Sequence, residues 1–381
     1  MEAVDVTTPR GRLPHCEFDR RPGLARAALD GRTAIVSNPT NIRWLTGFGG
    51  SLGWVVVGAE RAVLVTDGRY EERAAADLAA AGLDGVIELE VRYQRPEVVD
   101  AVVEAATALG GGPVLAEDAH LTHAAWLGLA GRLELEPAGN RVTALRRVKD
   151  PGELARMALA ACIADAALAE VAPMLDERPT EADVADELAL AMRRRGADGP
   201  SYETIVASGP TFAARPHHRT GSRTIVPGDT VVIDVGALVD SYHSDMTRTI
   251  VVGDPTTEQL AVYELVRRAQ AAGLAAVRAG VAAKDVDAAC RGVFREAGRE
   301  DWFVHGTGHG VGLEIHEDPF ENTTSQDTLL AGDVVTVEPG LYRDGFGGVR
   351  IEDLVTVTAT GCAPLTHLPK DAPCLRSPPT T

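Results

Sequence analysis

The feature that most constrains this sequence is an internal repeat. Residues 228–236 read Gly-Asp-Thr-Val-Val-Ile-Asp-Val-Gly, and residues 332–340 read Gly-Asp-Val-Val-Thr-Val-Glu-Pro-Gly. The acids Asp234 and Glu338 occupy the same place in the two copies and are 104 residues apart. A strand pattern that occurs twice with an acid at the same place indicates a duplicated β-hairpin fold with two similar halves.

Each copy continues into a further strand with a second acid, Asp245 in the first copy and Glu352 in the second. In an antiparallel hairpin, residues whose numbers share a constant sum stand opposite each other on one face. We therefore expect the two acids of each copy to face each other. The turn between them should lie near residues 239–240 in the first copy and near Gly345 in the second, where glycines suit a turn.

The first acid of each copy also interrupts an apolar run. Asp234 follows Val-Val-Ile, and Glu338 follows Val-Val-Thr-Val, where a solvated acid is out of place. Four carboxylates gathered on one buried face would repel one another, so cations are the natural compensation. The sequence predicts two divalent ions, and an oxygen-rich ligand set favours manganese, with cobalt, iron or zinc as alternatives.

Histidines form the second chemical signal. His305, His309 and His316 lie in one glycine-rich stretch, and His217 and His218 precede the first hairpin. The glycines prevent a regular helix and let the backbone approach a site closely. A neutral imidazole can bind a first-row metal, donate to a developing oxyanion or carry a proton. We therefore expect these histidines near the carboxylates.

The first third of the chain reads as alternating α/β structure. The expected strands lie at 33–37, 53–57 and 62–66, and a helix begins at about residue 71. A boundary is indicated near residues 146–151. There Asp150 is a good N-cap, Pro151 suits the first helical position, and Glu153 completes a capping box. A long helix should begin at this point.

Beyond the boundary, helical spacing alternates with strand-rich stretches. The expected helices lie at 154–175, 181–195, 258–278 and 286–298. This order is α+β and not βαβ. We therefore expect two domains: a smaller α/β domain of residues 1–146, with a structural or substrate-gating role, and an α+β domain of residues 147–381 that carries the chemistry.

Composition excludes several classes of protein. The 37 basic and 55 acidic side chains give a net charge of −18, which would repel nucleic acid and anionic membranes. The five cysteines are scattered and never form a CxxC pair, which favours reduced thiols in the cytoplasm. Neither a signal-peptide pattern nor an uninterrupted apolar stretch of ~18 residues is visible, so we expect a soluble protein.

Taken together, these motifs resemble the M24 metallopeptidases of pita-bread fold. That family includes aminopeptidase P, prolidase (Xaa-Pro dipeptidase) and methionine aminopeptidase, with creatinase as a metal-free relative. The matching segments of the second domain are 233–236, 244–248, 305–312, 337–340 and 349–353. Residues 37–48 and 66–70 are similar to the creatinase/prolidase N-terminal domain, which short methionine aminopeptidases lack.

The resemblance implies a site with named roles. The implied metal ligands are Asp234, Asp245, His309, Glu338 and Glu352. The implied catalytic set is His217, His305, His316 and Glu338, with Arg350 beside the ligands. His218 adjoins His217, and we favour His217 because it follows proline, as the family histidine often follows proline or leucine.

The resemblance also implies an activity. It implies hydrolysis of the bond between an N-terminal residue and proline by a metal-bridging hydroxide, with Glu338 as the proton carrier and a homodimer as the assembly. Aminopeptidase P and dipeptidase share all the residues named, so the sequence leaves that choice open. A metal-dependent small-amide hydrolase and a non-enzymatic peptide-binding module of the same fold are the alternatives.

Overall fold

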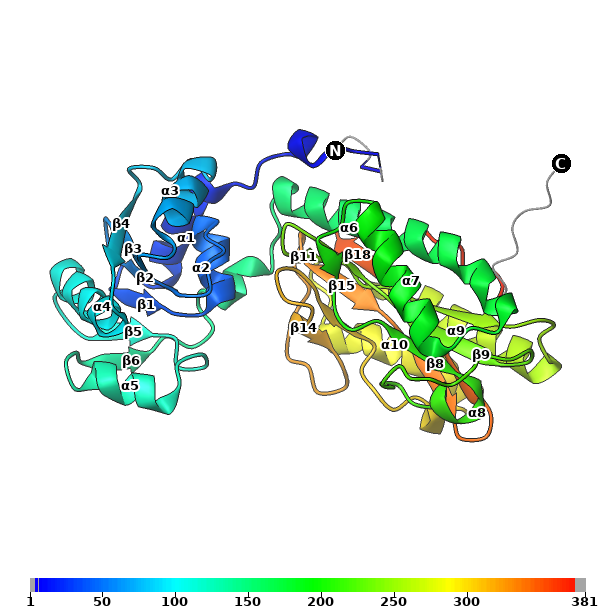
Figure 1. Cartoon of the computed structure of the whole chain (residues 1–381). Coiled ribbons are helices and arrows are strands. Elements are labelled where there is room, and N and C mark those ends of the chain that lie inside the picture. The colour runs from blue at the N-terminus through cyan, green and yellow to red at the C-terminus, as the bar shows by residue number, and fades with distance from the viewer. Residues whose placement is uncertain (1–3, 6, 374–381) are drawn as a thin grey trace. The chain divides into compact units, whose positions relative to one another are not determined.

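The computed structural model describes residues 4–5 and 7–373 (Figure 1). Their contacts divide the chain into two compact units. One unit is His15–Arg146, and the other comprises the described residues from Arg147 onward together with those that precede His15. The described residues before His15 therefore differ from the expected division, which assigned them to the N-terminal domain. Arg10 illustrates the reason, because its guanidinium donates to Asp198 at 2.8 Å and to Asp240 at 3.1 Å.

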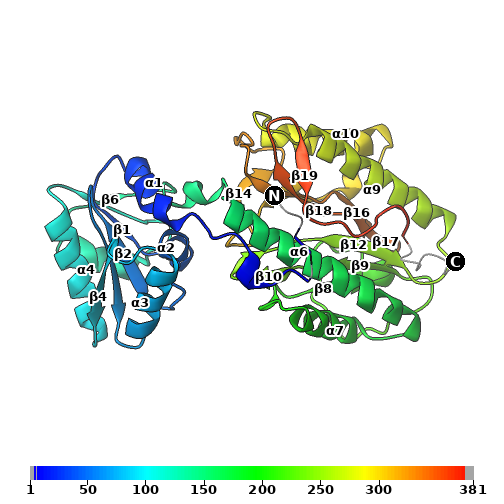
Figure 2. The same cartoon turned by 90° about the horizontal axis from the view of Figure 1, so that it is seen from above.

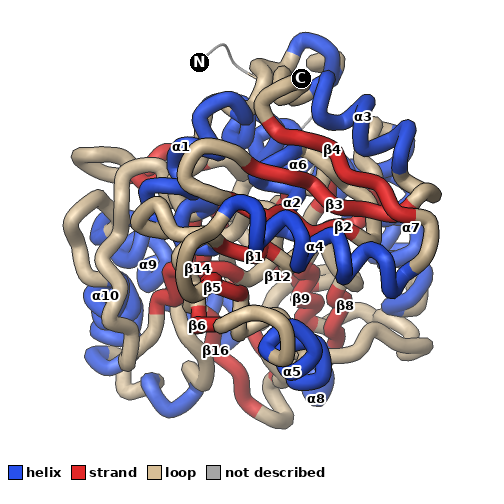
Figure 3. The backbone as a smooth tube through the Cα atoms, turned by 90° about the vertical axis from the view of Figure 1, so that its left-hand side faces the viewer, coloured by secondary structure: helices blue, strands red, loops and turns tan. Residues whose placement is uncertain are grey.

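The unit of residues 15–146 contains a six-stranded mixed sheet in the order β4-β3-β2-β1-β5-β6. Figure 3 shows β4, β3 and β2 running alongside one another in that order. The strands are β1 (Ala34–Val36), β2 (Gly53–Val57), β3 (Ala62–Asp67), β4 (Ile87–Arg92), β5 (Val114–Ala116) and β6 (Leu135–Pro137). The helices are α1 (Arg21–Ala28), α2 (Pro39–Thr46), α3 (Glu71–Ala80), α4 (Arg95–Leu109) and α5 (His123–Ala130), with short 3-10 turns at Phe18–Arg20 and Thr143–Arg146. The expected strands and the helix at residue 71 are confirmed.

A buried carboxylate organises the beginning of α2. Glu117 accepts hydrogen bonds from the backbone N–H groups of Ser37 and Asn38, both at 2.6 Å. The Asn38 side chain caps the helix by accepting from the Thr40 N–H. The N–H groups of Asn38 and Thr40 at the helix start are thereby satisfied, and an acid is well placed at that positive end.

The larger unit begins with two helices that cover the first half of its sheets. The helix α6 (Pro151–Val171) has the predicted capping box of Asp150 and Glu153, and α7 (Glu181–Arg194) has Thr180 as its N-cap. The strands of this half are β7 (Gly199–Pro200), β8 (Ile205–Ser208), β9 (Thr230–Asp234), β10 (Ala237–Val239), β11 (Tyr242–His243) and β12 (Thr247–Val251), and α8 (Gly209–Phe212) follows β8. Buried side chains of α6 and α7, such as Ile163 and Leu188, pack on Val231 and Ile233 of β9.

The second half repeats this plan. Its helices are α9 (Thr257–Ala276) and α10 (Ala283–Glu296). Its strands are β13 (Gly308–Gly310), β14 (Glu317–Glu321), β15 (Val334–Val337), β16 (Gly340–Arg343), β17 (Gly347–Arg350), β18 (Asp353–Val357) and β19 (Cys362–Pro364). In Figure 2 α9 lies beside α10 and α6 beside α7. Val266 and Phe294 from the helices pack on Val335 and Val355, so each half has its own core.

The registers test the predicted hairpins. In the first half Asp234 pairs with Thr247, so the prediction that it faces Asp245 is wrong by two residues. The turn lies at Asp240 and Ser241, which have positive φ angles of 50° and 69°. Because the shift is an even number of residues, both acids still belong to the same face.

In the second half both strand pairs are centred on Gly345. Val337 pairs with Asp353, and Gly340 pairs with Arg350. These registers place the two glutamates at equivalent positions on either side of the predicted turn, and that prediction is confirmed. The duplicated hairpins with covering helices form the mixed α/β arrangement that the pita-bread resemblance led us to expect.

Among the described residues, one helical stretch is long and apolar enough by composition to cross a membrane. It is Pro151–Glu177, which comprises α6 and the 3-10 turn Ala172–Glu177. Most of this stretch is buried inside the unit, and residues such as Ala160 and Leu168 belong to the core of the first half. We therefore interpret it as a core helix.

Candidate metal and catalytic site

A cavity of about 310 Å³ in the larger unit collects every predicted site residue. Its lining includes the five carboxylate and imidazole positions expected to bind metal and the three further histidines. These are Asp234, Asp245, His309, Glu338, Glu352, His217, His305 and His316, together with Arg350. Residues that are up to 135 positions apart in the chain therefore meet at one place.

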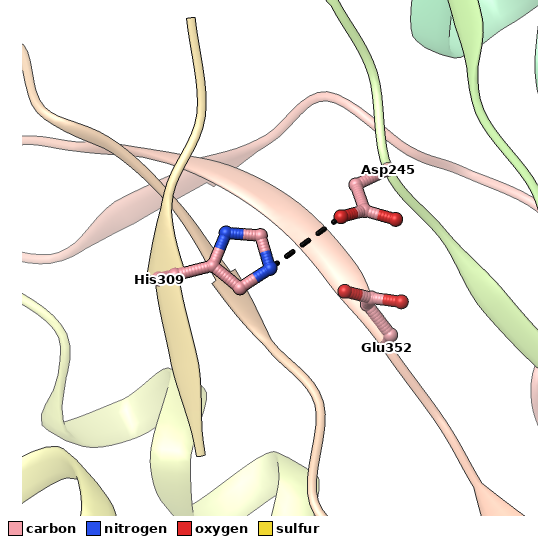
Figure 4. A group of neighbouring side chains, drawn as sticks. All are labelled: Asp245, His309 and Glu352. Carbon is pink, nitrogen blue, oxygen red and sulfur yellow. Dashed lines mark ion pairs between the residues drawn. The ribbon is translucent and has the colours of Figure 1, made fainter. Parts of the chain in front are cut away.

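Three of these side chains form the best-defined group. Asp245, His309 and Glu352 each offer a ligand atom, and these atoms lie within 4.8 Å of one another. Figure 4 shows the three side chains converging from three different segments of the chain. The His309 Nε2 is 3.6 Å from an Asp245 carboxylate oxygen. All three are buried, so the group can hold a cation away from bulk water.

The buried carboxylates of the site repel one another, and this repulsion appears as raised pKa values. Burial raises the pKa of Asp245 well above its usual range, and neighbouring Asp234 raises it further. Burial and the adjacent Asp245 likewise raise the pKa of Glu352. Burial and Glu352 raise the pKa of Glu338. Divalent cations would relieve this repulsion, so the donor set fits a metal centre.

Asp234 and Glu338 flank the group. The Glu338 Oε1 lies 3.6 Å from His309 Nε2, and its other oxygen lies 3.9 Å from Arg350 Nε. The Asp234 Oδ2 accepts a 2.7 Å hydrogen bond from Arg350. Burial lowers the pKa of His309 to about 4, so its imidazole is neutral at pH 7 and able to bind metal.

Arg350 ties the halves of the site together. It is almost completely buried and donates to the Thr247 hydroxyl at 2.9 Å, to the Pro216 carbonyl at 2.9 Å and to the Tyr342 hydroxyl at 2.9 Å. With the bond to Asp234, the planar guanidinium fixes four groups from both halves. Arginine suits this position because its guanidinium holds several N–H donors in one rigid plane.

The structure separates the two adjacent histidines. His218 is buried, stacks on Phe212 at 4.5 Å and lies 3.0 Å from a carboxylate oxygen of Glu181. His217 is exposed and lines the cavity. Because Arg350 holds the carbonyl of Pro216 on one side and Glu181 holds His218 on the other, His217 is left facing the cavity.

His305 and His316 line the same cavity. The His305 Nε2 is 3.0 Å from the Tyr342 hydroxyl, and burial together with Arg350 lowers the pKa of His305 to about 3. His316 is exposed at the cavity, and its ring lies 4.4 Å from that of His309 in an edge-to-face arrangement. His305 is therefore an uncharged hydrogen-bonding group.

Sequence reasoning missed the tyrosines of the site. The Tyr202 hydroxyl lies within hydrogen-bonding distance of both Asp234 and Asp245. Tyr342 bonds both His305 and Arg350. Neither tyrosine lies in the repeated segments 228–236 and 332–340, so the role of each is visible only from its contacts in the folded structure. The cavity is also lined by Pro216, and by Glu203, Ile205 and Ile315, which carried no sequence signal.

Comparisons with known proteins agree with this geometry. Residues 155–359 match the model of metallopeptidase family M24, and residues 23–148 match that of the Creatinase/Prolidase N-terminal domain. The chain is 35% identical over 351 residues to the peptidase YqhT of Bacillus subtilis, which is described as uncharacterized. That alignment covers 91% of this chain and 96% of YqhT.

Two solved structures share the whole fold. An Xaa-Pro dipeptidase from Bacillus anthracis has a TM-score of 0.87 and 34% identity, covering 93% of this chain and 99% of that one. An X-Pro aminopeptidase from Thermotoga maritima has a TM-score of 0.81 and 30% identity, covering 91% and 98% respectively. The shared architecture thus includes both exopeptidase types.

Proposed function

Because the chain belongs to metallopeptidase family M24, we propose that it hydrolyses the peptide bond between an N-terminal residue and a following proline. The observation that carries this proposal is the single cavity that unites the buried Asp245, His309 and Glu352 group with two further acids and three histidines. The similar structures named as an Xaa-Pro dipeptidase and an X-Pro aminopeptidase support proline as the residue after the cleaved bond.

We further propose the ligands and the metal. Asp234, Asp245, His309, Glu338 and Glu352 would hold two divalent ions. Four carboxylates and one imidazole form a hard donor set, which favours manganese. Bound there, the ions would polarise the scissile carbonyl and lower the pKa of a water from about 15.7 towards ~7.

The chain's own side chains would handle the proton and the carbonyl. Glu338 lies beside the ligand group and is partly accessible from the cavity, so its carboxylate can accept the water proton and deliver it to the leaving proline nitrogen. His217 and His316 are exposed to the cavity, where their ring N–H groups can donate to the carbonyl oxygen as it gains negative charge.

Proline explains why a dedicated enzyme is needed. Its nitrogen carries no hydrogen and its ring fixes φ, so peptidases that bond to that N–H bind it poorly. The apolar cavity residues Ile205, Pro216 and Ile315 offer a surface that a proline ring can contact without such a bond.

The direct test uses manganese-loaded protein and three peptides. Release of the first residue is followed from an Xaa-Pro dipeptide, an Xaa-Pro-Xaa tripeptide and an Xaa-Ala control. Cleavage of the dipeptide alone identifies a dipeptidase, and cleavage of the tripeptide identifies an aminopeptidase P. No proline-dependent cleavage, with two bound ions verified by elemental analysis, would sink the proposal and favour a metal-dependent small-amide hydrolase.

We propose a cytoplasmic homodimer, because four free cysteines occur among the described residues and the family resemblance of the sequence implies a dimer. Reduced thiols are typical of that compartment. Light scattering during chromatography gives the mass directly, and a monomer at working concentration would exclude the dimer.

A further inference from the structure

A buried ion pair lies next to the candidate catalytic histidines and outside the repeat. The Lys149 Nζ donates to the Glu317 Oε1 at 2.7 Å, and the two side chains are 1% and 4% exposed. Lys149 precedes α6, at the beginning of the larger unit, and its backbone N–H donates to the Gly332 carbonyl at 3.0 Å. Glu317 directly follows His316 in the chain.

The strand that begins at Glu317 is not held by a regular ladder. The β13–β14 register is interrupted between His309 and Gly310, so that His309 faces Phe320 while Gly310 faces Glu317. Such bulges re-aim side chains near active sites. The regular backbone pairing therefore does not by itself determine where His316 lies, and a further anchor is required.

Gly312 leaves room for that anchor. A Cβ atom at this position would lie 2.3 Å from the Glu317 Oε1 and 3.1 Å from the Lys149 Cε. The Gly312 carbonyl also accepts the backbone N–H of His243 at 2.9 Å, which links this loop to the segment that carries Asp245. The pair therefore fills a space between the two ligand-bearing segments.

Stability alone does not account for the pair. Removing two charges from water costs several kcal/mol, and apolar residues of similar volume are commonly as stable as a buried pair or more so. What an ion pair adds is a defined geometry. We propose that Lys149 is a positioning residue which, through Glu317, sets the place of His316 against His309. This inference rests on the proposed role of His316.

The test replaces the pair with apolar residues of similar size, Lys149→Met with Glu317→Leu. Stability to urea should stay close to that of the wild type, and the bound metal should remain at two ions. The kcat for the Xaa-Pro substrate should fall roughly 10- to 100-fold, because a misplacement of about 1 Å can cost that much. KM should change less than about threefold, since neither residue reaches the cavity. Wild-type kcat in this variant would overturn the proposal.

A second variant covers the case in which the apolar pair does not fold. Lys149→Gln with Glu317→Gln keeps side chains of similar length that can hydrogen-bond to each other and leaves no buried charge unpaired, so kcat should stay within about threefold of the wild type. If kcat fell as far as is expected for the apolar pair, the charges of the pair would be the cause and not the position of His316. That outcome would also contradict the proposal.

A spectroscopic measurement separates this inference from the proposed function. In zinc-loaded protein with labelled histidines, the ring resonances of His316 should shift in the apolar variant, while those of the remote His123 should not. This reading is independent of turnover. Unshifted His316 resonances would refute the positioning role, whereas a wild-type enzyme that cleaves no Xaa-Pro peptide would refute only the proposed function.

Discussion

The two halves of the larger unit carry the same repeat but build their acid pairs differently. In the first half the aspartates are offset by two residues in the ladder, and the Tyr202 hydroxyl contacts both of them. In the second half the longer glutamates lie at equivalent positions about Gly345. The first pair is thus organised by a neighbouring side chain, and the second by backbone register.

Hydrogen bonds between the two halves join the differently built acid pairs into one site. Arg350 of the second half donates to Asp234 of the first at 2.7 Å, and the Thr247 hydroxyl of the first donates to Glu352 of the second at 2.7 Å. The Glu352 N–H also donates to the Thr247 carbonyl at 3.1 Å. Duplication therefore supplied the frame, while the site depends on contacts that only the assembled pair of halves can make.

The largest expected effect on kcat comes from two single variants, each of which removes one acid from one half. Asp234→Asn and Glu352→Gln should each lower kcat by at least ~10³-fold, because a metal that activates water and polarises the carbonyl supplies several kcal/mol. Metal content, measured by elemental analysis, should fall below two ions in both variants. Glu296→Gln on the exposed face of α10 is the control. Full activity in either site variant would show that one half suffices.

The second effect concerns the arginine that joins the halves. Arg350→Met leaves Asp234 and the Tyr342 hydroxyl without their buried donor, and breaking a buried pair in this way costs about 3–5 kcal/mol. The free energy of unfolding in urea should fall by that amount, whereas the exposed Arg268→Met should have little effect. An unchanged urea midpoint for Arg350→Met would mean that the halves do not depend on this bridge.

The third effect appears when the metal is removed. Burial raises the pKa values of Asp245, Glu338 and Glu352 in the folded protein. A carboxyl group with a raised folded pKa stabilises the fold below its unfolded pKa, near 4, and that stability is lost as pH rises through the folded pKa. Melting temperatures of chelator-treated protein should therefore fall from pH 5 to pH 8, and manganese should remove this slope. A slope equal in both forms would contradict the electrostatic account.

The fourth effect compares matched hydroxyl deletions. Tyr202→Phe removes the hydroxyl that contacts both aspartates of the first half, and Tyr342→Phe removes the one shared by His305 and Arg350 in the second. A lost hydrogen bond to a charged group costs about 1.5–3 kcal/mol. We expect kcat to fall at least tenfold for Tyr202→Phe and less for Tyr342→Phe, as measured by steady-state kinetics. The reverse order would mean that the ladder, and not Tyr202, organises the aspartates.

The comparison of the halves also shows what sequence can predict. The capping box of Asp150 and Glu153 is local chemistry, and it was predicted correctly. The turn at Gly345 was also found, because glycine marks a turn. The first turn lies one residue beyond the expected position, because Asp240 and Ser241 adopt positive φ without a glycine to signal it.

The candidate site shows the same limit. Its nine predicted residues lie in short motifs that sequence reading can find, and all of them line one cavity. Tyr202 and the Lys149–Glu317 pair were not predicted, because their partners are 32 and 168 residues away in the chain. Long-range contacts of single residues leave no local pattern.

The smallest expected effect lies at the two hairpin turns. Arg10 at the first turn contacts Asp198 and Asp240 and is 35% exposed. Arg343 at the second turn contacts Glu258 and lies 4.4 Å from the Trp302 ring centroid and 5.4 Å from that of Phe346. Exposed ion pairs contribute about 0–1 kcal/mol, and a cation–π contact adds about 0.5–1 kcal/mol. Arg10→Ala should therefore lower the melting temperature less than Arg343→Ala. Adding 0.5 M salt should weaken the effect of Arg10 more, because ionic screening acts on the ion pair and not on ring contact. An equal salt response would show that both turns are held by charge alone.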